Sequence, residues 1–224
     1  MSGSLPPVIA IDGPSASGKG TVARLVACAL GFHYLDSGAL YRLVGLAVMD
    51  AGISLENESK ISWMALNLNV KFNEDTIVLN GRVVTDAIRD ETISNAASRV
   101  AALPGVRRAL LERQRALRQP PGLVADGRDM GSVVFPDATL KIFLTASAEA
   151  RAGRRYKQLM EKGMSANMDA LLQDISGRDA RDSARAAAPL QKCADAIQID
   201  TTGLTVEAVV EQVLTRYKQV LRAP

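Results

Sequence analysis

A glycine-rich segment near the start of the chain carries the residues best suited to bind phosphate. Gly13 and Gly18 enclose four residues, and Lys19 follows directly. Glycines at this spacing let successive backbone N–H groups point inward, and the lysine adds a positive charge for the β- and γ-phosphates of a nucleotide. The expected phosphate loop consists of Gly13, Pro14, Ser15, Ala16, Ser17, Gly18, Lys19, Gly20 and Thr21. We therefore expect the chemistry to begin with a nucleoside triphosphate.

The residue after Lys19 departs from the common phosphate-loop pattern. That pattern has Ser or Thr at this position as a magnesium ligand, whereas this chain has Gly20 and brings its hydroxyl one residue later, at Thr21. Thr21 is therefore the expected contact to Mg²⁺, either directly or through a water molecule. The Gly-Lys-Gly-Thr ending resembles nucleoside monophosphate kinases more than switch GTPases or motor ATPases.

Alternating strand-like and helix-like segments around this loop predict an α/β fold. The apolar run at 8–11 precedes the loop as a strand, and the segment 21–30 follows it as a helix that Gly31 ends. Strands are also expected at 32–35, 123–125, 140–144 and 196–199, and helices at 37–52, 90–101, 104–118, 148–162, 168–181 and 206–221. These segments predict a three-layer fold with a mostly parallel five-stranded sheet flanked by helices.

The middle of the chain predicts a separate small β structure. Residues 68–72, 76–79 and 82–85 are rich in β-branched and apolar residues, and Asn80-Gly81 lies between the last two runs. Asn-Gly between such runs is a strong hairpin signal. We therefore expect about three antiparallel strands inserted into the α/β chain, either as a stabilising lobe or as a mobile lobe over an acceptor site.

Charged residues follow two of the predicted strands directly. Asp36 and Ser37 come after the second strand with Arg42 one turn later, and Arg128 and Asp129 come after the strand at 123–125. In open α/β sheets, ligands bind outside the carboxyl ends of the strands. An anionic small molecule is therefore expected there, although Asp and Gly are also ordinary turn residues.

Composition favours a small-molecule enzyme over other classes of protein. The 224 residues carry a net charge of +3, are 47% hydrophobic and contain only 4% aromatic residues. A nucleic-acid surface is disfavoured because there is no Lys/Arg-rich tail and acids are mixed among the bases. The sequence has no apolar run of membrane length and no signal peptide before the loop, so a cytoplasmic protein without a membrane partner is expected.

The cysteines and the histidine predict neither a metal site nor a redox pair. Cys28 and Cys193 lie far apart and are expected to be reduced, buried thiols. His33 is the only histidine, and with two distant cysteines it cannot build a zinc site.

A series of motifs from Ile9 to Ala194 resembles the bacterial-type cytidylate kinase family. Beyond the phosphate loop, the series comprises Leu35-Asp36-Ser37-Gly38-Ala39, Tyr41-Arg42, Asn95-Ala96-Ala97-Ser98, the run from Ala125 to Gly131, Val134-Phe135-Pro136-Asp137-Ala138, Lys141-Ile142-Phe143-Leu144, Arg178-Asp179 and Arg181-Asp182. This resemblance implies transfer of the γ-phosphoryl group of ATP to CMP or dCMP. It also implies one kinase domain over residues 1–224, with a core at about 1–36 and 103–224, a monophosphate-binding lobe at about 37–102 and a lid at about 151–165.

The resemblance also implies roles for individual residues. Ser98, Arg107 and Asp129 are expected to read cytosine, while Arg178 and Asp182 are expected to bind the ribose. Arg42, Arg128 and Arg185 are expected to bind the acceptor phosphate, and Ser37 lies in the same substrate site. Lys19, Arg128 and Arg185 are the expected catalytic residues. Each has a plainer interpretation: Ser98 as a turn cap, Arg107 as a solvated helix arginine, and Arg178 with Asp182 as an ordinary i,i+4 pair.

Other roles stay open at the level of sequence. Asp126 either binds a water of the magnesium ion or orients Lys19. Arg151, Arg154, Arg155 and Lys157 form either a lid over ATP or an ordinary solvated helix face. The acceptor oxygen is already anionic, so no general base is needed and the expected task of the protein is alignment and charge neutralisation.

A monomer is expected, because it is the simpler state for an enzyme that must open and close. Three alternative functions remain. A kinase for UMP or AMP would differ in base selectivity. A regulatory P-loop ATPase would hydrolyse ATP without a monophosphate. A nucleic-acid binding module would be retained on DNA or RNA in a strongly salt-dependent way.

Overall fold

The computed structural model describes residues 5–73, 76–161 and 163–222. The chain divides into two compact units. The first unit contains the chain up to Asp36 together with the part that begins at Ala116, and the second unit is Ser37–Arg115. The expected monophosphate-binding lobe ended near residue 102, whereas the second unit also includes the helix that follows.

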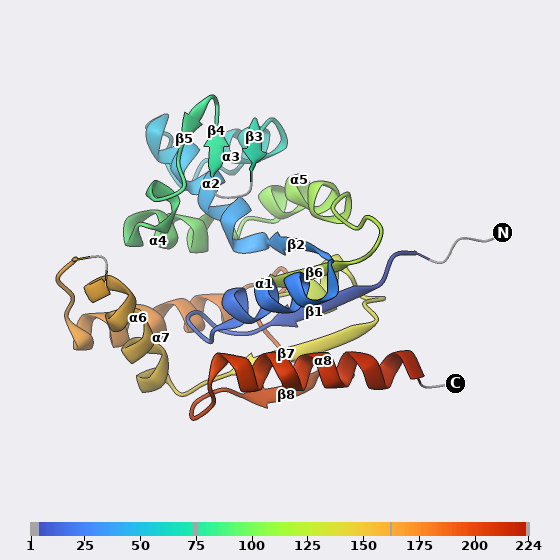
Figure 1. Ribbon diagram of the computed structural model, residues 1–224. Helices are drawn as coiled ribbons and strands as arrows, with labels where there is room; N and C mark the ends of the chain where they lie inside the picture. The colour runs from blue at the N-terminus through green and yellow to red at the C-terminus, as the bar shows by residue number, and fades with distance from the viewer. Residues whose placement is uncertain (1–4, 74–75, 162, 223–224) are drawn as a thin grey trace. The chain divides into compact units, whose positions relative to one another are not determined.

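The first unit is built on a five-stranded parallel sheet (Figure 1). Its strands are β1 (Val8–Asp12), β2 (His33–Asp36), β6 (Leu123–Gly127), β7 (Leu140–Thr145) and β8 (Ile197–Asp200). They lie in the order β2-β6-β1-β7-β8, so β1 is central and pairs with both β6 and β7. This sheet confirms the predicted α/β fold. The segments that leave the carboxyl ends of β1 and β6 therefore start side by side.

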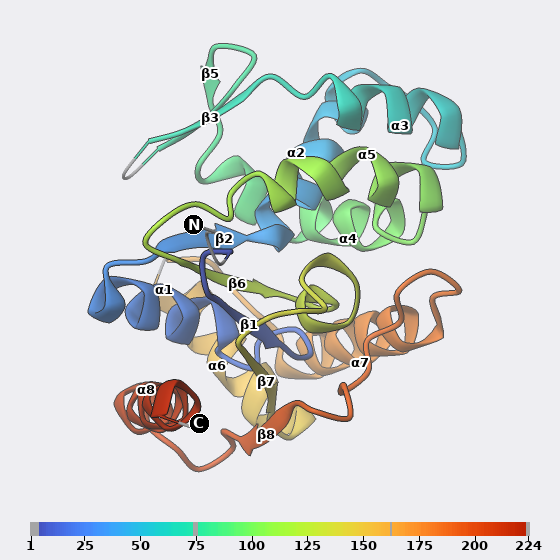
Figure 2. The same ribbon diagram turned by 90° about the vertical axis from the view of Figure 1, so that its right-hand side faces the viewer.

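The helices of the first unit include α1 (Lys19–Leu30), α6 (Ala148–Glu161), α7 (Met168–Ala184) and α8 (Val206–Arg222). The apolar faces of α1 and α8 pack on the sheet, and buried residues of α6 and α7 form a cluster of their own. Val22 and Val26 of α1 and Val209 and Val213 of α8 are buried in one core with the strands. Figure 2 shows α1 and α8 together on one side of the sheet and α7 on the other. None of the described helices is long and apolar enough to cross a bilayer.

In its described part, the second unit combines four α-helices and a short 3-10 helix, Ala87–Arg89, with a small antiparallel sheet. The helices are α2 (Ser37–Asp50), α3 (Glu58–Leu66), α4 (Glu91–Val100) and α5 (Pro104–Arg115), and the strands are β3 (Val70–Phe72), β4 (Ile77–Leu79) and β5 (Arg82–Val83). Asn80 and Gly81 both have positive φ, 49° and 84°, and join β4 to β5. Two successive positive φ values are those of a type I′ hairpin turn, so the predicted hairpin is confirmed.

Helix α3 was not predicted from the sequence. Its start carries a recognisable signal, because the Asn57 side chain accepts a hydrogen bond from the backbone N–H of Lys60 at 3.1 Å. Its apolar face is narrow, with only Ile61 and Ala65 buried. Helix α3 packs on α5, where Glu58 Oε1 accepts a hydrogen bond from the N–H of Gly105 at 2.6 Å.

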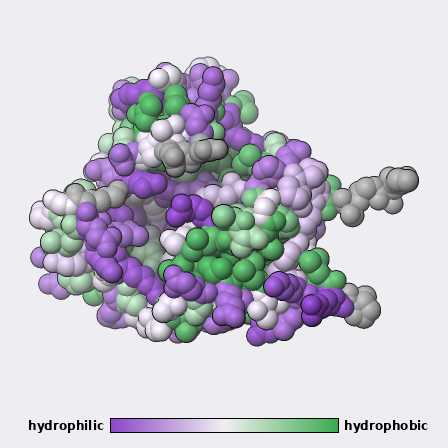
Figure 3. Space-filling model, in the orientation of Figure 1, coloured by the Kyte–Doolittle hydropathy of each residue, from purple (hydrophilic) through white to green (hydrophobic). Residues whose placement is uncertain are grey.

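The expectation that both cysteines are buried was wrong. Cys28 is exposed and Cys193 is partly exposed, and both are free thiols. Cys28 lies on the outer face of α1 beside Leu25, which is also exposed, whereas Val26 and Ala27 point into the core. Figure 3 shows an apolar surface patch over this helix. The 3.6-residue period of α1 decides the burial of Cys28 rather than the general preference of cysteine for the interior.

Candidate active site

The phosphate loop connects the end of β1 to the start of α1. Gly13 approaches β7 so closely that a Cβ atom on it would lie 2.2 Å from the carbonyl oxygen of Leu144. Gly18 is the N-cap of α1 with φ 90°, a left-handed conformation that glycine adopts without strain. The open N-terminus of a helix directs backbone N–H groups and its positive dipole end at an anion. The loop therefore has the conformation that the glycine spacing predicts, with the helix N-terminus open at its end.

Lys19 is the first residue of α1, and its ammonium group is buried. Its Nζ donates to the carbonyl oxygen of Pro14 at 3.1 Å. Burial and the positive charge of Arg128 lower the pKa of Lys19 to about 7, while Asp126, Asp36 and Asp182 act in the opposite direction. An anionic ligand beside Lys19 would therefore stabilise its charged form.

Two oxygen-bearing side chains, those of Asp126 and Thr21, lie near the first turn of α1. Asp126, at the end of β6, accepts a hydrogen bond from the Tyr34 hydroxyl at 3.0 Å, and its other oxygen would lie 3.6 Å from a Cβ placed on Gly20. The Thr21 side chain is exposed on the first turn of α1. Hydroxyl and carboxylate oxygens suit a magnesium ion, which keeps several waters and phosphate oxygens and needs only one or two protein ligands. Among the described residues, no three His, Cys, Asp or Glu side chains form a complete protein metal site.

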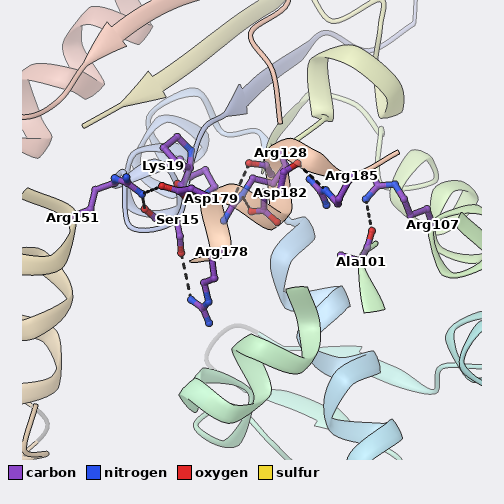
Figure 4. A network of polar contacts seen from close by, with 12 residues as sticks. Ser15, Lys19, Ala101, Arg107, Arg128, Arg151, Arg178, Asp179, Asp182 and Arg185 are labelled. Carbon is purple, nitrogen blue, oxygen red and sulfur yellow. Dashed lines mark hydrogen bonds and ion pairs between the residues drawn. The ribbon is translucent and has the colours of Figure 1, made fainter. Parts of the chain in front are cut away.

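Arg128, Asp182 and Arg185 form a charged cluster after β6 and at the end of α7, in which Asp182 and Arg185 are buried and Arg128 is half-buried (Figure 4). Arg128 Nε donates to Asp182 Oδ2 at 2.8 Å and its Nη1 donates to the carbonyl oxygen of Gly127 at 3.2 Å. Arg185, just after α7, donates from Nε to the backbone oxygen of Asp182 at 3.2 Å. Asp129 is 2% exposed. The structure thus brings Lys19, Arg128, Asp182 and Arg185 close together.

Asp12 belongs to this site although the sequence analysis gave it no role. Its carboxylate accepts hydrogen bonds from the backbone N–H groups of Met130 at 2.9 Å and Gly131 at 2.8 Å. Burial raises the pKa of Asp12 to about 6 although the two backbone hydrogen bonds lower it. Met130 starts a π-helical turn, Met130–Val134, that was also not predicted. The sequence signal that could have pointed to Asp12 was a charged residue at the end of the otherwise apolar strand β1.

Basic residues of α6 contact the back of the phosphate loop. Arg151 pairs with Asp179 of α7 at 2.6 Å and donates to the carbonyl oxygen of Ser15 at 3.2 Å. Arg154 donates to the carbonyl oxygen of Ser17 at 3.2 Å and to Thr201 Oγ1 at 3.0 Å. Thr201, which follows β8, was missed because only the fold brings it to this loop.

Other side chains of these helices differ in their contacts. Arg178 of α7 donates to the Ser15 hydroxyl at 3.5 Å. Lys157 is exposed and pairs with Glu161 of the same helix, and the half-buried Arg155 donates to Gln158. Of the four basic residues of the expected lid, Arg151 and Arg154 donate to carbonyl oxygens of the phosphate loop.

The remaining predicted substrate residues belong to the second unit. Ser37 starts α2 and is buried, while Arg42 of α2 and Ser98 of α4 are half-buried. Helices α2 and α4 pack closely, since a Cβ on Gly45 would lie 3.1 Å from the backbone nitrogen of Ala97. Arg107 of α5 donates to the carbonyl oxygen of Ala101 at 3.2 Å and lies 5.6 Å from the centre of the Tyr41 ring.

Comparison with known proteins identifies close relatives over nearly the whole chain. The sequence profile of the family described as "Cytidylate kinase" matches residues 9–219. The chain is 59% identical to the "Cytidylate kinase" of Burkholderia pseudomallei (strain 1106a) over 213 residues, which cover 95% of this chain and 93% of that protein. It is 60% identical to the "Cytidylate kinase" of Bordetella pertussis (strain Tohama I) over 208 residues, or 93% of each chain.

A solved structure supports the fold at much lower sequence identity. A gluconokinase from Sinorhizobium meliloti 1021 aligns with a TM-score of 0.50 at 17% identity and covers 97% of this chain and 95% of that chain.

Proposed function

Because the chain belongs to the cytidylate kinase family, it transfers a phosphoryl group from ATP to CMP or dCMP, and we propose that the charged cluster of the first unit performs this transfer. The observation that carries the proposal is the buried Lys19 at the N-terminus of α1, with Arg128 and three carboxylates acting on its charge. Such a lysine stabilises negative charge on the transferred group without the reorganisation that water would need.

Lys19, Arg128 and Arg185 neutralise the charge of the transferred phosphoryl group. The acceptor is a phosphate oxygen that is already anionic, so the residues need to align the reactants rather than remove a proton. Asp182 fixes the orientation of Arg128 through the 2.8 Å ion pair. An ion pair that is present before substrate arrives leaves less side-chain freedom to lose on binding.

Magnesium is proposed to contact the exposed Thr21 hydroxyl, with Asp126 close enough to bind one of its waters. Held by these residues, magnesium would supply positive charge that neutralises part of the charge of the phosphate groups. The Tyr34 hydroxyl keeps the Asp126 carboxylate oriented for this role.

Three residues are proposed to recognise cytosine: Ser98, Arg107 and Asp129. Cytosine has an exocyclic amine beside the acceptors N3 and O2, so a carboxylate and an arginine satisfy it, whereas uracil would place a carbonyl against the carboxylate. Arg178 and Asp182 are proposed to bind the ribose hydroxyls, and a carboxylate accepts from either the 2′- or the 3′-hydroxyl. Arg42, Arg128, Arg185 and Ser37 are proposed to bind the acceptor phosphate.

The segment at about 151–165 is proposed to act as a lid over ATP. Arg151 and Arg154 already bind carbonyl oxygens of the phosphate loop, so they are the lid residues with the shortest path to the ATP phosphates. The protein is further proposed to act as a cytoplasmic monomer without a nucleic-acid or membrane partner. Light scattering tests the monomer directly, and a dimer mass would contradict it.

The test of this proposal is ADP release from Mg-ATP with CMP, dCMP, UMP, AMP and GMP supplied one at a time. Rapid release with CMP and dCMP only is expected, and Lys19→Ala should lower turnover by about 10²–10³-fold while the protein remains folded. Release that does not depend on a monophosphate, or near-normal turnover of Lys19→Ala, would contradict the proposal.

A further inference from the structure

Asp12 is a buried carboxylate that joins two loops of the first unit. It is 5% exposed and ends β1, one residue before the phosphate loop. Its two oxygens accept from two consecutive backbone N–H groups, those of Met130 and Gly131. A carboxylate at the start of a helical turn stabilises that turn and fixes the position of its first residues.

The segment fixed in this way is the one that follows Arg128 and Asp129. In the sheet, Asp12 of β1 lies opposite Gly127 of β6. Beyond this pair the segments that follow β1 and β6 separate, because the first enters the phosphate loop and the second continues into Arg128. The Asp12 carboxylate links them again after backbone pairing has ended.

Burial makes the charged form of the Asp12 carboxylate costly. The charged groups that act on it are Asp129 and Arg128 from the loop after β6. Lys141 of β7 lies near the same turn, since its side chain is 3.1 Å from a Cβ placed on Gly131. The negative charge of Asp12 also contributes to the raised pKa of the Cys193 thiol. A buried amide could satisfy one of the two N–H groups without a charge, but it would place a donor against the other.

We propose that Asp12 is a positioning residue for phosphoryl transfer, which sets the place of Arg128 and Asp129 relative to the phosphate loop. It does not touch the reactants and acts through the backbone of Met130 and Gly131. The inference rests on the role proposed above for Arg128. Misplacement of a reacting group by about 1 Å costs on the order of 10²-fold in rate, so the link matters even though no substrate atom contacts it.

The first test is Asp12→Asn, with Asp200→Asn as the matched control. Asp200 also ends a strand of this sheet and accepts a hydrogen bond from a backbone N–H, that of Thr202 at 2.9 Å. We expect kcat of Asp12→Asn with CMP to fall about 10–100-fold. Its dissociation constant for a non-hydrolysable ATP analogue should stay within about threefold, because the N-terminus of α1 and Lys19 are unchanged. Asp200→Asn should keep kcat within about twofold.

Three results would overturn the proposal. They are a kcat of Asp12→Asn within twofold of the wild type, a loss of ATP-analogue affinity as large as the loss of kcat, or a loss of kcat no larger than the loss of folded protein. Thermal unfolding at pH 7.5 supplies the last comparison.

Gly131→Ala tests the same link when Asp12→Asn does not fold. An added Cβ would lie 3.1 Å from Lys141 Cδ and 3.5 Å from Asp12 Oδ2, directly beside the carboxylate oxygen that accepts from the Gly131 N–H. We expect about a threefold to tenfold loss of kcat with unchanged ATP-analogue affinity. When both variants fold, the double variant should lose less than the product of the two single losses, because both changes act on one link. An unchanged kcat in Gly131→Ala would count against the proposal.

Arg128→Met in the same assay separates this inference from the proposed function. When Arg128→Met loses turnover and Asp12→Asn does not, only the positioning role of Asp12 fails. When Arg128→Met itself keeps normal turnover, the proposed transfer site fails.

Discussion

The two units of the chain differ in the burial of their charged side chains. Among the described residues, every charged side chain that is buried lies in the first unit: Asp12, Lys19, Asp126, Asp129, Arg151, Asp182 and Arg185. In the second unit, the proposed substrate residues Arg42, Ser98 and Arg107 are only half-buried. Buried charges interact strongly and are costly to place. Under the proposed assignment, the first unit holds preformed buried charges for the transfer, while Arg42, Ser98 and Arg107 of the second unit contact substrate from partly exposed positions.

The largest effect in the first unit should come from Gly13→Ala. The new Cβ would lie 2.2 Å from the backbone oxygen of Leu144, so β1 or β7 must move and the phosphate loop with it. We expect a loss of about 1–3 kcal/mol in unfolding free energy and at least ~10²-fold in turnover. Denaturant unfolding and initial rates measure the two effects.

A glycine of the first unit outside the loop provides the control. Gly153 lies within α6 with no atom within 4 Å of an added Cβ. Gly153→Ala should raise stability by about 0.5–1 kcal/mol because alanine has the higher helix propensity. Equal losses in the two variants would mean that the close approach at Gly13 has no special importance.

The cost of a buried charge in the first unit should be visible as a pH dependence of stability. The pKa of Asp12 is raised from 3.8 to about 6, so between these values the folded protein keeps a proton that the unfolded chain has released. Stability relative to Asp12→Asn should therefore fall as pH rises from 4 to 6, by up to about 3 kcal/mol, and stay level above that. Parallel denaturant unfolding of both proteins at pH 4, 5, 6 and 7 tests this, and a constant difference would contradict it.

A smaller effect is expected from Ser98→Ala in the second unit. Loss of one hydrogen bond to the base should raise KM for CMP about fivefold to tenfold and leave kcat within about twofold. The ratio of CMP to UMP activity should fall in parallel. A loss confined to kcat would place Ser98 in the transfer step and blur the distinction between the units.

The sequence predicted the parts of this molecule that depend on local signals. The glycine spacing of the phosphate loop, the apolar runs of the parallel sheet and the Asn80-Gly81 hairpin each follow from backbone geometry or a short period. Helix α3 was not predicted because its buried apolar face is narrow. Asp12 and Thr201 were not predicted because the loops that they bind, at Met130 and at Ser17, lie 118 and 184 residues away in the chain.

The wrong prediction that Cys28 is buried has a different cause. The general preference of cysteine for the interior gave the wrong expectation, while the positions of Val22 and Val26 on α1 would have given the right one. Roles that depend on a ligand, such as those of Arg107 and Asp129, stay predictions because they concern contacts with a molecule rather than the fold.

The most direct test of the contrast between the units is the same substitution in each of them. Arg128→Lys and Arg107→Lys both keep the charge and lose the planar, forked donor group of arginine. Steady-state kinetics with CMP at saturating Mg-ATP should show a loss of kcat of about 30-fold or more for Arg128→Lys. For Arg107→Lys they should show a rise in KM with kcat nearly unchanged. Equal loss of kcat in both variants, or a change confined to KM in Arg128→Lys, would contradict the account.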